Sequence, residues 1–130
     1  MTAKSKICVI DDDEIYQFYS KSIIDCTERV QEVLQFFDGQ EALDFFQQHQ
    51  QHDDQLPELI LLDLEMPYLD GWQFLDQYRK LELARDITLF VVSSSASQTD
   101  REKALKYPCV KGYITKPMTA QQFKEILDAL

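Results

Sequence analysis

The stretch Leu59-Ile60-Leu61-Leu62-Asp63 consists of four apolar side chains followed directly by a carboxylate. A continuous apolar run of this length, without the alternation of a half-exposed strand, is typical of a strand buried on both faces of its sheet. Such sheets are almost always parallel and carry helices on both faces. We therefore predict an α/β domain, with Asp63 at the carboxyl end of one of its buried strands.

The segments on either side of this stretch alternate between strand and helix patterns. Apolar and β-prone runs predict four further strands, at 7–10, 30–37, 87–92 and 110–115. Between them lie segments with apolar residues at helical spacing, and in the first of these one helical face carries Ile15, Phe18, Tyr19, Ser22, Ile23 and Cys26. Five strand–helix alternations predict a doubly wound, five-stranded parallel sheet with five helices on its two faces.

The composition is that of a globular chain with a large acidic excess. Of the 130 residues 45% are apolar, and 23 Asp and Glu against 13 Lys and Arg give a formal net charge of −10. This length predicts a single domain over residues 1–130, with its core at about 6–130. The acidic charge argues against direct binding to nucleic acid or to an anionic membrane, because phosphate groups require a basic surface.

The cysteines and the lengths of the apolar runs predict the cellular compartment of the protein. Cys8, Cys26 and Cys109 are an odd number without C-x-x-C spacing, which indicates reduced, mostly buried thiols in a cytoplasmic protein. No stretch approaches the roughly 18 apolar residues of a membrane span. The apolar run at the N-terminus is also too short for a signal peptide.

A polar segment at residues 47–55, QQHQQHDDQ, stands out from the strand and helix patterns. We interpret it as a helix end followed by a loop. His49 and His52 are three residues apart and could meet a metal ion together with Asp53. A solvated helix end is the simpler interpretation and the one that the composition favours.

Polar side chains follow four of the five predicted strands. Asp11 and Asp12 follow the first strand, Asp63 the third, Ser93 the fourth and Lys116 the fifth. In a doubly wound sheet these positions lie at the carboxyl edge, where ligands bind. Carboxylates gathered there repel one another and recruit a cation such as Mg²⁺. A carboxylate beside Mg²⁺, with a lysine and a hydroxyl opposite, can accept a phosphoryl group.

Each of these residues also has an ordinary structural explanation. Asp13, the third acid after the first strand, is expected to be the N-cap of the following helix. Taken singly, Ser93 would be a turn residue and Lys116 a surface lysine. Their occurrence together, each at a strand end, favours a shared site.

These motifs resemble the receiver domain of two-component response regulators, the family of the chemotaxis protein CheY. The resemblance covers roughly residues 6–130. It is carried by the segments 9–12 (VIDD), 61–67 (LLDLEMP), 70–71 (DG), 91–93 (VVS) and 112–117 (GYITKP). It implies a flavodoxin-like sheet with strand order 2-1-3-4-5.

The resemblance also implies a role for each matched residue. Asp63 corresponds to the phosphoacceptor. The implied ligands of Mg²⁺ or Mn²⁺ are Asp11, Asp12, Asp63 and the backbone carbonyl of Glu65. The implied phosphate-contacting and switch residues are Ser93, Lys116 and Tyr113, with Tyr113 rotating inward when Ser93 moves, and the implied cis-proline is Pro117.

The family implies a bacterial, cytoplasmic, single-domain response regulator. It would receive a phosphoryl group from a histidine kinase or a phosphotransfer protein and act on an unidentified protein target through the surface of its last two helices and last strand. It would not be an enzyme, apart from hydrolysing its own aspartyl phosphate. Ser93 stands where threonine is commoner, residues 47–55 are longer than usual, and Glu65 and Ser95 occupy variable positions that tune dephosphorylation.

Two other functions stay open from the sequence. One is a phosphatase of the haloacid-dehalogenase type, because these enzymes also use a strand-end aspartate and Asp11-Asp12-Asp13 fits their D-x-D pattern. The other is an interaction module that has lost phosphorylation, against which the complete acid, serine and lysine set argues.

Overall fold

Five parallel strands form the sheet that the apolar runs predict. In this computed structural model, which describes residues 5–130, they are β1 (Ser5–Ile10), β2 (Val30–Phe36), β3 (Leu59–Leu62), β4 (Thr88–Ser93) and β5 (Val110–Thr115). Their order in the sheet is β2-β1-β3-β4-β5, and every neighbouring pair is parallel. The predicted fold class and strand order are therefore confirmed.

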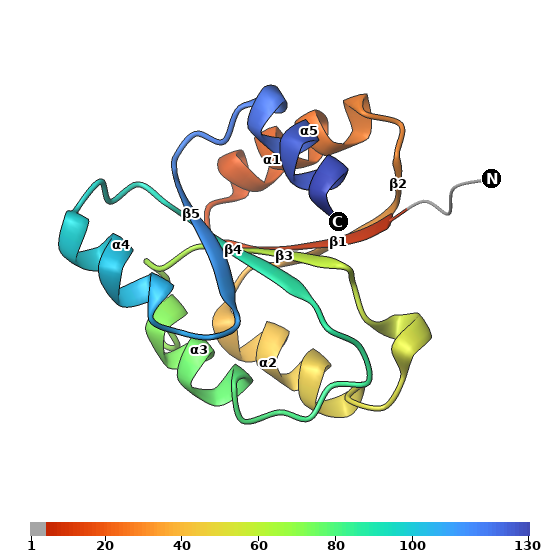
Figure 1. Cartoon of the computed structure of the whole chain (residues 1–130), viewed down its shortest axis with the longest axis vertical. Helices are drawn as coiled ribbons and strands as arrows, with labels where there is room; N and C mark the ends of the chain where they lie inside the picture. The colour runs from red at the N-terminus through yellow and green to blue at the C-terminus, as the bar shows by residue number, and fades with distance from the viewer. Residues whose placement is uncertain (1–4) are drawn as a thin grey trace.

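Helices cover both faces of the sheet, as the alternation requires. They are α1 (Glu14–Cys26), α2 (Gly39–Gln48), α3 (Gly71–Tyr78), α4 (Gln98–Leu105) and α5 (Ala120–Ala129), with a short 3₁₀ helix, η1, at Asp53–Gln55. α1 and α5 lie on one face, and α2, α3 and α4 lie on the other (Figure 1). None of the helices in residues 5–130 is both long and apolar enough to cross a bilayer.

The core has two halves, one on each face of the sheet. Alternate residues of β1 divide between them: Cys8 and Ile10 face α2 and α3, while Ile7 and Val9 face α1 and α5. Every residue of β3 is buried, as expected for a strand with neighbours on both sides and helices on both faces. This burial fixes the carboxyl end of β3 in the middle of the sheet edge.

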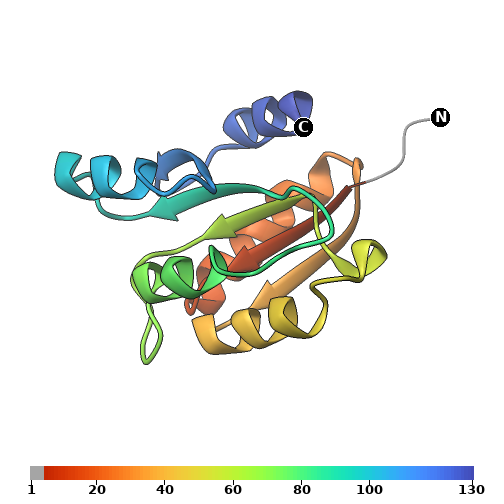
Figure 2. The same cartoon turned by 60° about the horizontal axis from the view of Figure 1, so that its bottom comes forward.

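The strands all point in the same direction, so the loops that follow them gather at one edge (Figure 2). Side-chain caps at that edge start several helices, and the predicted N-cap at Asp13 is confirmed: its carboxylate accepts from the amides of Ile15 and Tyr16 at 2.9 and 3.2 Å. Gly71 begins α3 against the loop after β3, where a Cβ would lie 2.6 Å from the backbone oxygen of Asp63. Only glycine permits this close approach.

Most of the apolar face predicted for α1 points away from the core, and of its members Ile23 alone packs against the core cluster. The helix instead buries Gln17, Ser20 and Ile24, whereas Ile15 and Phe18 are 82% and 77% exposed. Polar Gln17 is tolerated inside because its amide finds backbone acceptors there. The periodicity identified the helix but not the face that packs against the sheet.

Two smaller expectations have mixed outcomes. The cysteines are all free, but only Cys8 is buried, while Cys26 is exposed and Cys109 is half-buried. The segment at 47–55 is the end of α2, a turn and η1, as predicted. Main-chain and side-chain hydrogen bonds attach it to the loop before β4, among them Ala84 N–H to the carbonyl of Gln50 at 2.7 Å.

Candidate functional site

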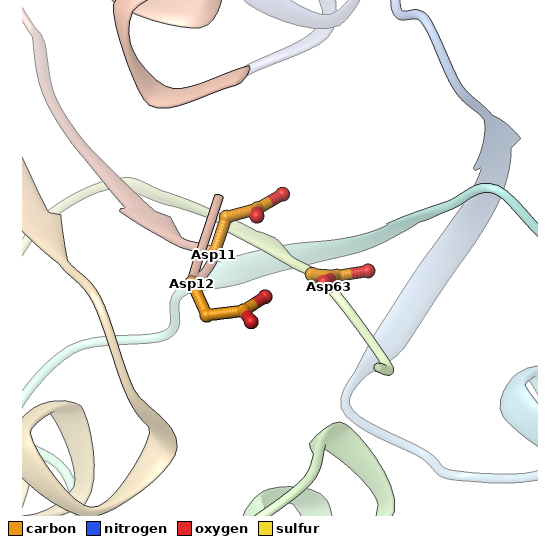
Figure 3. A group of neighbouring side chains, drawn as sticks. All are labelled: Asp11, Asp12 and Asp63. Carbon is orange, nitrogen blue, oxygen red and sulfur yellow. The ribbon is translucent and has the colours of Figure 1, made fainter. Parts of the chain in front are cut away.

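Three carboxylates meet at the carboxyl edge of the sheet. Asp11 and Asp12 follow β1, Asp63 follows β3, and one oxygen from each lies within 4.8 Å of the others (Figure 3). Asp11 and Asp63 are buried, while Asp12 is exposed. The amide of Asp63 donates to the carbonyl of Ile10 at 2.9 Å, so β-sheet pairing itself holds the acids together.

Lys116, directly after β5, brings a positive charge to this cluster. Its Nζ lies 2.7 Å from Oδ2 of Asp11 and 3.5 Å from Oδ1 of Asp63. The ammonium also lies over the ring of Tyr16, 4.4 Å from the centroid. The backbone amide of Lys116 donates to the carbonyl of Ser93 at 2.8 Å, and the Lys116–Pro117 peptide bond is cis.

Burial and charge shift the protonation of these groups. Burial, with repulsion from Asp11, raises the pKa of Asp63 to about 6, although Lys116 favours the ionised form. Burial also raises the pKa of Asp11 against the opposing hydrogen bond from Lys116. Burial alone would lower the pKa of Lys116, but its hydrogen bond to Asp11 and the charge of Asp63 raise it overall. The site therefore carries crowded negative charge that a single lysine only partly balances.

Ser93 and Tyr113 are both buried and are linked through the loop after β4. The hydroxyl of Ser93 accepts a hydrogen bond from the amide of Ser95 at 3.1 Å, and the phenol of Tyr113 donates to the carbonyl of Ser95 at 2.7 Å. Ser95 Oγ in turn donates to Asp100 in α4 at 2.7 Å. Tyr113 thus already faces inward here, and the loop between β4 and α4 connects it to Ser93.

Open space borders the acids on two sides. One cleft, of about 480 Å³, is lined by Asp12, Asp63, Glu65 and Lys116 among others, and a second, of about 500 Å³, by Asp12, Glu65, Ser93 and Asp100 among others. A larger hollow of about 740 Å³ lies at the opposite edge, at the amino ends of β4 and β5, and contains none of the three acids. A ligand could therefore reach Asp63 from solvent beside Lys116.

Sequence reasoning missed two residues that shape the site. Gln17 donates from its buried amide to the carbonyls of Val9, Asp11 and Phe36, and so ties together the ends of β1 and β2. Tyr16 supplies the ring beneath Lys116, and its hydroxyl accepts from the amide of Met118 at 3.1 Å. Both lie in α1, outside the helical face that the apolar residues of this helix define, so the sequence pattern did not point to them.

The cluster has the chemistry of a divalent-cation site. Several carboxylate oxygens within a few ångströms of one another, one of them open to solvent, suit a hard ion that keeps some water ligands. Among residues 5–130, this is the only group of three such side chains close enough to share one ion. The residues present therefore fit Mg²⁺.

Comparisons with known proteins agree with this geometry. The family model of the response regulator receiver domain matches residues 7–128. The crystal structure of a two-component response regulator from Cytophaga hutchinsonii superimposes with a TM-score of 0.87 and 27% identity, covering 97% of this chain and 96% of that one. A receiver domain of a Pseudomonas aeruginosa sensor histidine kinase, with magnesium in its active-site cleft, has a TM-score of 0.79 and 23% identity over 98% of this chain and 97% of that one.

Among curated proteins, one relative is a protein from Methanothrix harundinacea named "Probable methanogenesis regulatory protein FilR2". It is 32% identical over 93 residues, which are 72% of this chain and 59% of that protein. The chain spans only 11% of the next curated relative, a sensor histidine kinase of Helicobacter pylori. The matched region is thus a domain that also occurs within longer signalling proteins.

Proposed function

The chain belongs to the family of response regulator receiver domains, and from this we propose that it accepts a phosphoryl group on Asp63 from a phosphohistidine. The donor would be a histidine kinase or a phosphotransfer protein. The observation that carries the proposal is the position of Asp63, which is buried at the end of β3, bordered by an open cleft, and has Lys116 Nζ 3.5 Å from its Oδ1.

The transfer is a simple exchange of bonds. A carboxylate oxygen of Asp63 attacks the phosphorus and forms an O–P bond as the P–N bond of the phosphohistidine breaks. The electron pair remains on the imidazole nitrogen, which takes up a proton from water. Lys116 balances charge on the phosphoryl oxygens.

We assign the metal-holding role to Asp11, Asp12, Asp63 and the backbone carbonyl of Glu65. The closeness of the three carboxylates and the position of Glu65 in both clefts support this assignment. When bound, Mg²⁺ would neutralise the crowded carboxylates and polarise the phosphoryl group. Mn²⁺, which takes the same oxygen ligands, would substitute for it.

The exposed part of α1 supports a protein as the phosphoryl donor. Ile15 and Phe18, which are 82% and 77% exposed, lie on the helix that begins directly after the acidic loop. Exposed large apolar side chains with charged neighbours, close to a reactive site, are typical of a protein contact. A donor that rests on this face of α1 would have its phosphohistidine next to Asp63.

For the output, we propose a changed surface formed by α4, β5 and α5. α4 is weakly anchored, because Ala104 is its only buried residue. Two contacts between cations and rings help to hold it: Arg101 lies 5.2 Å from the ring centroid of Tyr113, and Lys103 lies 4.2 Å from that of Trp72. A movement of Ser93 toward a phosphoryl group would disturb Ser95, and through it both Tyr113 and α4.

We further propose that the domain hydrolyses its own aspartyl phosphate and works in a bacterial cytoplasm, without acting as an enzyme on other molecules. Glu65 lines both clefts and Ser95 lies in the loop between β4 and α4, and from these positions the two side chains could direct water toward the phosphoryl group. Three free cysteines are in keeping with a reducing compartment.

Acetyl phosphate with Mg²⁺, followed by intact mass measurement, tests the proposed chemistry. The parent protein should gain one phosphoryl group that Asp63→Asn does not gain. Turnover of other phosphoesters would point to the phosphatase alternative, and no labelling at all would point to an interaction module. Either of these results would overturn the proposal.

A further inference from the structure

The two histidines of the chain face each other at the end of α2, far from the acidic cluster. The Nδ1 atoms of His49 and His52 are 3.1 Å apart, and their ring centroids are separated by 5.4 Å. These residues belong to the polar segment that precedes β3, at the sheet edge opposite to Asp63. The proposed phosphoryl chemistry uses neither of them.

The local backbone brings the two rings together. His49 is the C-cap of α2, and its carbonyl accepts from the amide of His52 at 3.0 Å, which closes the turn between them. The ring of His49 also packs against that of Phe45, with centroids 4.5 Å apart. Because one ring packs on a helix side chain and the other lies on a closed turn, part of the entropy cost of bringing the two nitrogens together is already met.

The segment that carries the histidines is itself fastened to the rest of the domain. Gln50 accepts from the amide of Glu82 through its side chain, and Gln51 donates to the carbonyl of Glu82. Arg85 contacts Asp53 and Glu58 at 2.9 and 3.0 Å. These contacts anchor the backbone that carries the two histidines to the loop before β4 and to Glu58.

A nitrogen–nitrogen separation of 3.1 Å matches the span of one metal ion. Two Zn–N bonds of about 2.0–2.1 Å, at an angle between about 90° and 109°, place the nitrogens about 2.8–3.4 Å apart. Imidazole nitrogen is a preferred ligand of Zn²⁺, Cu²⁺ and Ni²⁺ and a poor one for Mg²⁺. The electrostatics also favour a cation, because the C-terminal end of a helix carries partial negative charge and the chain has a net charge of −10.

Asp53 is not part of this pair, although the sequence suggested it as a third ligand. Its Oδ1 accepts from the Nε of Arg85, and these three side chains do not form a group close enough to share one ion. The coordination positions that the histidines leave free would therefore be filled by water. His52 is exposed, which gives an ion and its water ligands access from solvent.

We propose that His49 and His52 form a second metal site, selective for a divalent transition-metal ion of the Zn²⁺ and Cu²⁺ class over Mg²⁺. Both imidazoles bind through Nδ1. The site is separate from the acidic cluster, so it can be filled while Mg²⁺ occupies the proposed phosphoryl site. A bound ion would hold the end of α2 to the turn before η1.

Calorimetric titration of the untagged protein with ZnCl₂, in saturating MgCl₂, tests this site. We expect one zinc ion per chain, and we expect His52→Gln and His49→Phe each to lower the zinc affinity by at least about tenfold, since loss of an outer-shell partner alone costs 10–100-fold. His49→Phe retains a ring against Phe45. Gln48→Ala, an exposed change next to the pair, should leave zinc binding unaltered.

Nitrogen NMR of the imidazoles gives a direct second measurement, because the chain contains only two histidines. Zinc should shift the Nδ1 signals of both together, with the same midpoint as the calorimetry. Asp12→Ala should retain zinc binding, which separates this site from the acidic cluster and from the proposed phosphoryl transfer. The proposal would be overturned if zinc binding survived both histidine changes or were lost in Asp12→Ala. It would also be overturned if the parent protein bound no zinc, which would mean that the two nitrogens share only a hydrogen bond.

Discussion

The phenol of Tyr113 donates a hydrogen bond to the backbone carbonyl of Ser95, 2.7 Å away. The bond joins β5 to the loop after β4, and the same loop contacts the buried hydroxyl of Ser93. The family resemblance implies a tyrosine that rotates inward on phosphorylation, yet Tyr113 is already buried in this structure. The contact therefore gives the loop a defined resting position.

Removal of this phenol should loosen the loop. Tyr113→Phe keeps the ring and loses the hydrogen bond, so we expect a loss of about 1 kcal/mol in the free energy of unfolding. Amide hydrogen exchange at residues 95–97 should become faster. Tyr68→Phe, which alters a tyrosine that is 98% exposed, is the matched control and should change neither measurement. Unchanged exchange in Tyr113→Phe would show that the contact does not hold the loop.

The buried charge of Asp63 should make stability depend on pH. Its pKa in the folded state is about 6, above the ordinary 3.8, so the folded protein binds this proton more tightly than the unfolded chain does. The stability that this proton provides is present below about pH 4 and is lost as the pH rises through 6. A pKa shift of this size corresponds to about 2–3 kcal/mol in the free energy of unfolding.

Urea unfolding without divalent cations measures this effect. Between pH 4 and pH 7 the parent should lose stability relative to Asp63→Asn, which carries no titrating group at this position. Asp54→Asn, at an exposed position, should follow the parent. Parallel pH profiles for the parent and Asp63→Asn would contradict the assigned shift.

Mg²⁺ should stabilise the protein through the same carboxylates. At 100 times its dissociation constant, a ligand that binds only the folded state adds about 2.7 kcal/mol. We expect Mg²⁺ to raise the melting temperature of the parent and to have little effect on Asp12→Ala. Glu14→Gln removes a nearby exposed acid outside the cluster and should keep the response. If Mg²⁺ raised the melting temperature of Asp12→Ala as much as that of the parent, Asp12 would not be a ligand.

The exposed face of α1 should matter for a protein donor and not for a small one. Phe18→Ser should slow phosphoryl transfer from the phosphorylated kinase or phosphotransfer protein by about fivefold or more, because interface anchors contribute over 1 kcal/mol. Labelling by acetyl phosphate should stay at the parent rate. Leu130→Ser, at a half-exposed site beyond α5, is the control. Equal slowing with both donors would indicate damage to the site rather than to a docking surface.

Gln17 should stabilise the folded state although its side chain is polar. Gln17→Leu leaves the carbonyls of Val9, Asp11 and Phe36 without this donor, so we expect a loss of about 1–3 kcal/mol in urea unfolding. Gln48→Ala, an exposed glutamine change, should stay within about 0.5 kcal/mol of the parent. A neutral effect of Gln17→Leu would mean that the strand ends find other donors.

The order and type of the main helices and strands were predictable from the amino-acid sequence. The apolar run at 59–62 is typical of a strand buried on both faces, and carboxylates placed directly after strands reach one edge of a parallel sheet. The Asp13 cap was also predictable, because capping depends on residues that are close in the chain. The phosphoacceptor and metal roles rest on the family resemblance, and they stay proposals.

Features that depend on neighbours far along the chain were not predictable from the sequence. A helical period shows that α1 has an apolar side, but only the acceptors at the ends of β1 and β2 explain why Gln17 is buried and Phe18 is exposed. The closer approach of Lys116 to Asp11 than to Asp63 depends on how separate elements pack. Spacing in sequence fixes which side chains share a face or an edge, whereas distances of a few ångströms arise only when the whole core is assembled.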